Sequence, residues 1–263
     1  MEQARVVRVK SPLSGWVGGK SLLARRIVPM IPPHRCYVEP FAGAAWTLFS
    51  KEPSESEVIN DINREVVTLY RVVQHHLEEF VRCFKWALVS REEFGRWLQT
   101  PPDTLTDIQR SVRFYYLQKS AFGGRMDGRP TFGYSTVRPP KLNLLRIEED
   151  LSAAHLRLSQ VYVEHLPYLD LIKRYDRLET FFYVDPPYWG CEDYYGKSLF
   201  EREDFSRLAD ALAGIKGKFL LSINDVPEIR ETFKAFCVEE VATRYSVANG
   251  KSLPVIELLI RNY

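Results

Sequence analysis

The stretch that decides the fold is YVDPPYWG, residues 183–190, which directly follows a run of apolar and aromatic residues. Proline has no backbone N–H and cannot continue a central strand, so a buried strand over 181–184 has to stop at Asp185. The strand therefore ends on a carboxylate, a rigid Pro186-Pro187 bend and Tyr188. In open α/β sheets, ligands bind beyond the carboxyl ends of the strands. We therefore expect a ligand site at this point.

Around this stretch, the C-terminal half alternates strand-like and helix-like segments. We expect strands over 161–166, 181–184 and 219–223, each followed by a helical segment, over 170–177, 203–214 and 226–236. Two last strands, 238–247 and 255–260, would be joined by a turn at Asn249-Gly250. This alternation predicts an α/β domain with a mostly parallel sheet and an antiparallel edge.

The N-terminal part carries a second such unit and then a different pattern. Strands are expected over 37–39 and 58–61, with a helix over 44–50. Residues 64–150 are instead helical and aromatic, with helices over 66–84, 91–98 and 108–122, before the Gly/Pro-rich loop 123–140. In the last helix, one face would carry Ile108, Val112, Tyr115 and Phe122. We predict an α/β domain of residues 1–63 and 151–263 with a helical insertion at 64–150.

Charge is concentrated in the insertion. The chain of 263 residues has a net charge of +2, but the segment 110–146 has eight basic residues against one acid, Asp127. That segment is at +7 and the rest of the chain at −5. A local basic field indicates a face for a polyanion, although a solvated basic surface gives the same pattern.

Composition excludes several classes of protein. No apolar run approaches the ~20 residues of a membrane span, and the N-terminus is too charged for a secretory signal. The four cysteines lie far apart with no CxxC pair, which argues against a zinc site and for reduced thiols in the cytoplasm. We expect a cytoplasmic protein without a membrane partner.

Acids stand at three expected strand ends: Glu39, Asp61 and Asp185. Glu39 precedes a turn, PFAG at 40–43, whose small residues let the backbone approach a ligand. Asp61 then lies where a nucleotide ribose would meet a carboxylate, although it could also cap the next helix. The stretch GGKS, 18–21, is similar to the end of the phosphate-binding pattern GxxxxGK[ST]. The first glycine of that pattern would be position 14, which is Ser14, so the pattern does not match. Trp16 and Lys20 can still wall a pocket.

Taken together, these residues resemble the Dam-like D12 class of DNA adenine-N6 methyltransferases. The resemblance covers most of the chain and rests on WVGGK (16–20), YVEPFAG (37–43), INDIN (59–63), DPPY (185–188), the pair Leu221-Ser222 and the closing ELLIRNY (257–263). DPPY also occurs in RNA methyltransferases, but four motifs in this order and spacing are specific.

The resemblance implies a Rossmann-like methyltransferase sheet that uses S-adenosyl-L-methionine to methylate N6 of an adenine flipped out of double-stranded DNA. Asp185 and the Pro186 carbonyl would accept the amine hydrogens and localise its lone pair, and Tyr188 would stack on the base. It implies a cofactor site formed by Trp16, Lys20, Glu39, Phe41, Asp61, Ile62 and Asp185. The insertion would be the target-recognition part. We expect the protein to act as a monomer.

For DNA, the resemblance places Arg125 at the position of the arginine that contacts a guanine in GATC-specific members. Arginine suits this role because it can bond guanine O6 and N7 bidentately. Phosphate contacts are expected from the other basic residues of the insertion: Arg113, Lys119, Arg129, Arg138 and Lys141.

Two positions depart from the GATC-specific members. Those members carry a lysine before the WxGGK tryptophan, where this chain has Gly15, and a proline-phenylalanine-glycine where it has Thr131-Phe132-Gly133. We hypothesise relaxed or altered target specificity. The alternatives are an RNA adenine-N6 methyltransferase and a catalytically silent nucleic-acid-binding module.

Overall fold

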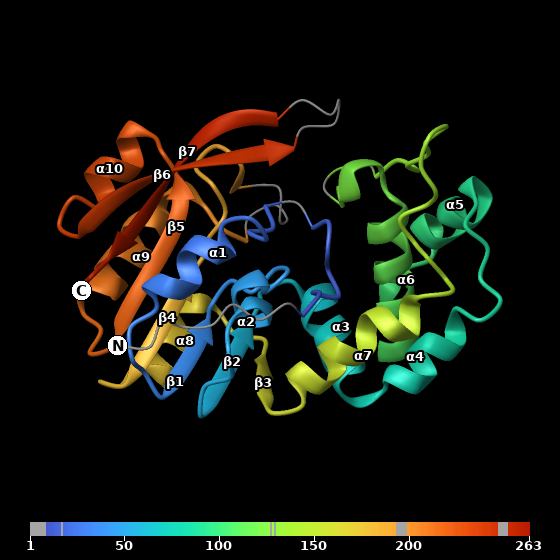
Figure 1. Ribbon diagram of the computed structural model, residues 1–263, viewed down its shortest axis with the longest axis horizontal. Helices are drawn as coiled ribbons and strands as arrows, with labels where there is room; N and C mark the ends of the chain where they lie inside the picture. The colour runs from blue at the N-terminus through green and yellow to red at the C-terminus, as the bar shows by residue number, and fades with distance from the viewer. Residues whose placement is uncertain (1–8, 17, 127, 129, 193–198, 247–251) are drawn as a thin grey trace.

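The fold was established from a computed structural model, which describes residues 9–16, 18–126, 128, 130–192, 199–246 and 252–263. Its centre is a seven-stranded sheet in the order β3-β2-β1-β4-β5-β7-β6 (Figure 1). The first five of these strands are parallel, and β7 runs antiparallel to β5 and β6. The strands are β1 (Cys36–Glu39), β2 (Ser56–Asn60), β3 (Val161–Glu164), β4 (Thr180–Val184), β5 (Lys218–Asn224), β6 (Cys237–Ser246) and β7 (Ser252–Arg261).

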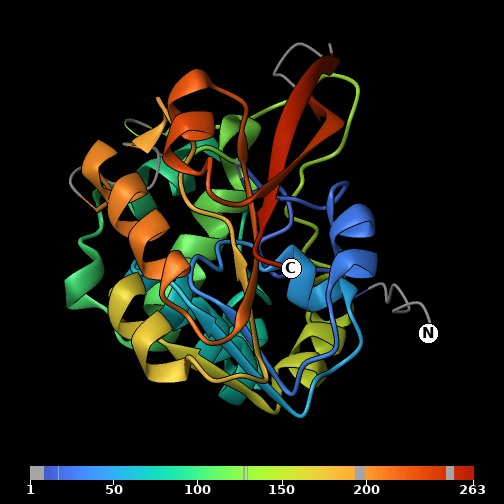
Figure 2. The same cartoon turned by 90° about the vertical axis from the view of Figure 1, so that its left-hand side faces the viewer.

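The sheet is buried on both faces because alternate residues of its central strands enter two separate cores. On β4, Phe181 and Tyr183 belong to one core, and Phe182 and Val184 belong to the other. The second core is closed by α8 (Tyr168–Tyr175), α9 (Arg202–Ala213) and α10 (Pro227–Thr232). The first is closed by α1 (Ala24–Ile27), the short 3-10 helix η1 (Val28–Met30) and α2 (Trp46–Ser50). Figure 2 shows the blue helices and the orange helices on opposite sides of the sheet.

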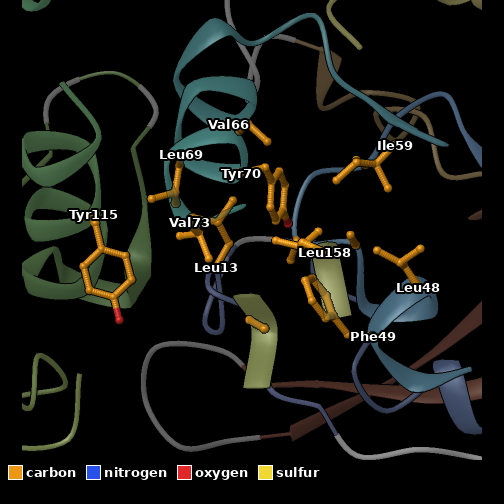
Figure 3. Packing of buried hydrophobic residues seen from close by; sticks show 14 of the residues in the cluster. Leu13, Leu48, Phe49, Ile59, Val66, Leu69, Tyr70, Val73, Tyr115 and Leu158 are labelled. Carbon is orange, nitrogen blue, oxygen red and sulfur yellow. The ribbon is translucent and has the colours of Figure 1, made fainter. Parts of the chain in front are cut away.

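The helical part lies beyond the β3 edge of the sheet (Figure 1). Its elements are α3 (Arg64–His75), α4 (Leu77–Cys83), α5 (Arg91–Gln99), η2 (Pro102–Thr104), α6 (Asp107–Ser120), η3 (Phe122–Gly124) and α7 (Ile147–Leu158). Helix α3 joins this part to the sheet domain. In Figure 3 its side chains Val66, Tyr70 and Val73 lie near Leu158 of α7 and Phe49 of α2.

The predicted fold class is confirmed, including the antiparallel edge. The Asn249-Gly250 turn lies outside the described residues. The single helix expected over 66–84 is wrong: it breaks into α3 and α4 at His76, whose φ of −135° and ψ of 34° are not helical. Phe122 is also wrongly placed, because α6 ends at Ser120 and Phe122 is 49% exposed. The boundary predicted at residue 150 falls inside α7.

A buried charge cluster fixes α7 to the sheet. Glu57 on β2 accepts hydrogen bonds from Lys51 Nζ at 2.5 Å and from Arg157 on α7 at 2.8 Å. Burial opposes ionisation of Glu57, but Arg157 and Lys51 together hold the pKa of its carboxyl below the usual value. Arg157 also donates to the Leu48 carbonyl, so one guanidinium joins β2, α2 and α7.

Helix α6 begins at a capping box. The Thr106 hydroxyl accepts from the Gln109 N–H, and the Gln109 side chain accepts from the Thr106 N–H. We expect Thr106→Ala to lower the free energy of unfolding by about 1 kcal/mol, which is roughly 2–4 °C in Tm. Thermal unfolding monitored by circular dichroism checks this. Thr106→Ser keeps the hydroxyl and should unfold like wild type; equal losses in both variants would contradict the assignment.

Candidate active site

A pocket opens at the carboxyl ends of β1, β2 and β4, where the strand order reverses direction from β1 to β4. Its volume is about 290 Å³, near the lower end for small-molecule sites. Every residue expected to bind the cofactor lines it: Trp16, Lys20, Glu39, Phe41, Asp61, Ile62 and Asp185. The parallel strands explain the convergence, since their carboxyl ends share one edge of the sheet.

Glu39 stands at the end of β1 and is almost completely buried. Its Oε1 accepts from the Tyr37 hydroxyl at 2.7 Å and from the Leu48 N–H of α2 at 2.8 Å. Burial raises the pKa of the Glu39 carboxyl to about 8, against the opposing effect of these hydrogen bonds. Glu39 thus holds α2 against the pocket while facing the pocket itself.

Asp61 organises the turn after β1. Its Oδ2 accepts from the Gly43 N–H at 2.9 Å, and its Oδ1 accepts from the Asn63 N–H at 2.8 Å. Burial raises the pKa of the Asp61 carboxyl, and these backbone donors oppose the rise. The cap of α3 is Asn63, whose side chain accepts from the Glu65 N–H, so the capping role considered for Asp61 belongs to Asn63.

Aromatic rings form the wall toward α8. The Phe41 ring lies 5.2 Å from the Tyr168 ring and 5.8 Å from the Phe200 ring, centre to centre. Opposite them, Gly19 packs so closely that an added Cβ would lie 2.9 Å from Trp46 Nε1. Gly19 is therefore required by the close approach of its backbone to Trp46, and Gly18 has a φ of +77°, which favours glycine. Ile62, 38% exposed, lies at the mouth.

Asp185 is held by two donors. Lys20 Nζ lies 3.0 Å and Ser222 Oγ 3.1 Å from its Oδ1. Burial raises the pKa of the Asp185 carboxyl, while the Lys20 charge lowers it. The Ser222 hydroxyl is also 2.9 Å from the Tyr183 hydroxyl.

The Pro-Pro turn is clamped to β5. Asn224 Oδ1 accepts from the Trp189 N–H at 3.0 Å, and Asn224 Nδ2 donates to the Trp189 carbonyl at 3.2 Å. Tyr188 accepts a hydrogen bond from Lys20 Nζ at 2.6 Å and donates to Glu257 of β7. The turn that carries the expected catalytic residues Asp185, Pro186 and Tyr188 is thus fixed from two neighbouring elements.

Sequence reasoning missed Ser222, Asn224 and Glu257 as site residues. The signal was present: each is a polar residue in an otherwise apolar strand, in FLLSIN (219–224) and VIELLI (255–260). Polar groups are buried in central strands only when they have partners. Ser222 and Asn224 reach the site through the β4–β5 pairing, in which Val184 lies opposite Leu221, and Glu257 reaches it through the β5–β7 pairing, in which it lies opposite Asn224.

The described residues that were expected to contact DNA divide into an exposed group and a buried or half-buried group. Arg125, Arg138 and Lys141 are exposed, and Arg129 lies outside the described residues. Lys119 departs from the expectation because it is buried and donates to the Ser14 carbonyl at 2.7 Å and to its hydroxyl at 2.9 Å. Burial lowers the pKa of Lys119 to about 7. Arg113 is half-buried, and its Nε donates to the Trp97 carbonyl.

Fewer residues of the basic segment 110–146 are therefore available to contact DNA than its composition indicates. Besides Lys119, Arg110 is buried and bonds Glu65 of α3 and Asp103, and Arg146 pairs with Glu149. Arg110 therefore joins elements within the insertion, and Lys119 joins the insertion to Ser14. In the described part of the chain, no cluster of metal-ligating side chains occurs, and no helix is long and apolar enough to cross a bilayer.

The chain is similar in sequence to known methyltransferases. The Type II methyltransferase M.CviBI of Paramecium bursaria Chlorella virus NC1A is 26% identical over 264 residues, covering 96% of this chain and 99% of its own. The DNA adenine methylase of Escherichia coli (strain K12) is 26% identical over 275 residues, covering 94% of this chain and 93% of its own. The Type II methyltransferase M.MjaIII of Methanocaldococcus jannaschii is 23% identical over 293 residues, covering 96% and 99%.

The model of one protein family matches residues 16–247, a span that begins at Trp16 and includes the pocket, the Pro-Pro turn and the helical insertion. The protein is accordingly an adenine-specific DNA methyltransferase, and the chain belongs to the D12 class of N6 adenine-specific DNA methyltransferases.

Proposed function

We propose that this protein transfers a methyl group from S-adenosyl-L-methionine to N6 of an adenine flipped out of duplex DNA. The observation that supports this best is the meeting of an apolar pocket with the Asp185 carboxylate at one end of the sheet. The carboxylate lies on the pocket wall itself, so a donor in the pocket and an amine on Asp185 would be adjacent.

The pocket residues fit this cofactor. Asp61 faces the pocket from the end of β2, where a carboxylate can accept from ribose hydroxyls, and Phe41 offers an aromatic face to an adenine ring. The Thr47 hydroxyl is buried in the pocket wall and has no partner among the described residues, which suits a polar ligand group. Trp16, Lys20, Glu39 and Ile62 would complete the enclosure.

When bound, the cofactor supplies a methyl group on a positively charged sulfur that leaves as a neutral thioether. Asp185 and the Pro186 carbonyl would accept the two hydrogens of the adenine amine, which localises its lone pair toward the methyl group. Tyr188 would stack on the flipped base. The Asn224 clamp and the two donors to Asp185 keep these groups in place before the substrates arrive.

The helical insertion, residues 64 to about 150, would read the DNA. Exposed Arg125 follows η3 and can reach a guanine edge, whereas exposed Arg138 and Lys141 suit phosphates. Arg129 stays a candidate for a phosphate contact. We propose a monomer acting in the cytoplasm.

Target specificity should be relaxed or altered relative to GATC-specific members. Gly15 has no side chain to read a base, and its φ of +87° favours glycine. Its carbonyl oxygen would lie 2.3 Å from a Cβ at Gly124, so this glycine packs against the recognition insertion. At Thr131, the carbonyl accepts from the Phe122 N–H, which fixes the loop by its backbone.

The test is methyl transfer from labelled S-adenosylmethionine to unmethylated genomic DNA, followed by single-molecule mapping of N6-methyladenine, with Asp185→Ala as the inactive control. Methyladenine in several contexts supports the proposal with its relaxed specificity. Methyladenine confined to GATC contradicts the specificity, and transfer to RNA alone contradicts the proposed substrate.

Replacing Arg125 and Lys141 should have different consequences. Arg125→Ala should cost about 1–3 kcal/mol of DNA affinity and relax preference at one base position. Lys141→Ala should weaken binding to all sequences alike and lower the salt slope of log K by about 1. Fluorescence anisotropy with labelled duplexes at several salt concentrations measures both. Lys234→Ala, at an exposed lysine beyond α10, serves as the control and should bind like wild type.

A further inference from the structure

The Lys20 ammonium is shared between two carboxylates inside the site. Its Nζ lies 3.0 Å from Asp185 Oδ1 and 3.5 Å from Glu257 Oε1. It also donates to the Tyr188 hydroxyl at 2.6 Å and lies 4.2 Å from the centre of that ring. The Lys20 side chain is 3% exposed and that of Glu257 is fully buried, so bulk water does not screen these contacts.

The ammonium contacts the two groups that the proposed reaction assigns to the target adenine, Asp185 and the Tyr188 ring. That amine must donate to Asp185 while its base stacks on Tyr188. Asp185 Oδ1 already accepts from Lys20 and from Ser222, which occupies the two lone pairs of that oxygen. An amine that donates to this oxygen has to displace one of these two donors, and Lys20 is the one that also covers the Tyr188 ring.

Glu257 is the acceptor to which Lys20 can move. It extends from β7 toward the site, and its Oε2 has no partner among the described residues. A buried carboxylate with an unbonded oxygen is unfavourable unless a cation approaches it. A shift of Lys20 toward Glu257 would satisfy that oxygen and release Asp185 in the same movement.

The ionisation of Glu257 determines how strongly it attracts the ammonium. Among the described residues, the ionisable groups around it are Lys20, Asp185, Tyr188 and Tyr183; its strand partners Asn224 and Val241 do not ionise. Burial raises the pKa of the Glu257 carboxyl to about 7, with Lys20 opposing the rise and Asp185 adding to it. Glu257 is thus an anion above neutral pH and neutral below it.

We propose that Glu257 is a positioning residue, which draws the Lys20 ammonium away from Asp185 when the target amine docks. The proposal rests on the proposed methyl transfer, and it assigns to Glu257 an effect on the reaction that is exerted through Lys20, beside the hydrogen bond that Glu257 accepts from Tyr188.

The first experiment compares wild type with Glu257→Gln in single-turnover methyl transfer to DNA between pH 5.5 and 8.5, with saturating cofactor. The wild-type rate should rise with a midpoint near pH 7, as Glu257 ionises. Glu257→Gln keeps the size of the side chain but not the charge. Its rate at high pH should be roughly 10–100-fold lower, and the step near pH 7 should be absent. A merely structural role would lower the rate at every pH and leave the step in place, and that result would overturn the proposal.

The second experiment needs no methyl transfer. The Glu257 carboxyl is observed by 13C NMR, identified by its loss in Glu257→Gln, and titrated in wild type and in Lys20→Met. We expect titration near pH 7 in wild type and at a higher pH in Lys20→Met, because the neighbouring cation is gone. Titration near the ordinary glutamate value, or no change in Lys20→Met, would overturn the pairing. A wild type that shows the pairing but methylates no adenine would instead contradict the proposed function.

Discussion

Asp185→Asn is expected to lower the single-turnover rate of methyl transfer by about 10²–10⁴-fold. The asparagine keeps the size of the side chain, and its carbonyl can still accept from Ser222. It replaces an acceptor for the adenine amine by an NH₂ donor and removes the negative charge opposite Lys20. In the proposed mechanism, both changes act on the step in which the adenine amine becomes the nucleophile.

Cofactor binding separates this effect from unfolding. The affinity for S-adenosylmethionine, measured by titration calorimetry, should change less than tenfold in Asp185→Asn, since most of the pocket wall is untouched. Ser222→Ala is the matched control: it removes one hydrogen bond of 3.1 Å to Asp185 and leaves the charge. A neutral hydrogen bond contributes about 1 kcal/mol, so this variant should lose roughly fivefold in rate. An Asp185→Asn rate within tenfold of wild type would refute the assigned role.

The parallel part of the fold could be predicted from local sequence because its signals are local. A strand such as FYV before Asp185-Pro186-Pro187 is apolar throughout, and proline marks its end. The acids at the ends of β1, β2 and β4 could be grouped into one pocket because carboxyl ends of parallel strands share an edge. The pocket does bring Glu39, Asp61 and Asp185 together.

Partnerships between distant residues could not be predicted in this way. Lysines at positions 20 and 119 look alike in sequence, but one pairs with Asp185 and the other is buried against Ser14. Likewise, Glu257 is the single polar residue of VIELLI (255–260), and only the antiparallel β5–β7 register brings it to the site. No proline or glycine signals the break at His76. The helix α4 that follows it packs Phe80 into the core, and this contact is not visible in the local sequence.

Gly124→Ala is expected to disrupt the contact between the Ser11–Trp16 segment and the recognition insertion. Gly124 has a φ of +73°, and a Cβ there would lie 2.3 Å from the Gly15 carbonyl oxygen. Because the obstructing atom belongs to backbone, one of the two segments has to shift. Lys119, which bonds Ser14 from α6, resists that shift on the other side. The shift would move Arg125, the next residue along the chain, away from its place relative to the pocket.

We therefore expect Gly124→Ala to lower methyl transfer on DNA by about 10²-fold, the size of effect that a misplacement of about 1 Å produces, with cofactor affinity unchanged within a few-fold. Gly123→Ala is the matched control. Gly123 has a similar φ of +68°, but its Cβ would meet only the Arg125 side chain at 3.7 Å. It carries the same backbone strain of about 1–2 kcal/mol without the collision. Single-turnover kinetics with both variants measure the difference. If both lost activity equally, backbone strain alone would account for the loss, and close packing of Gly124 on Gly15 would have no part in holding the insertion against the active site.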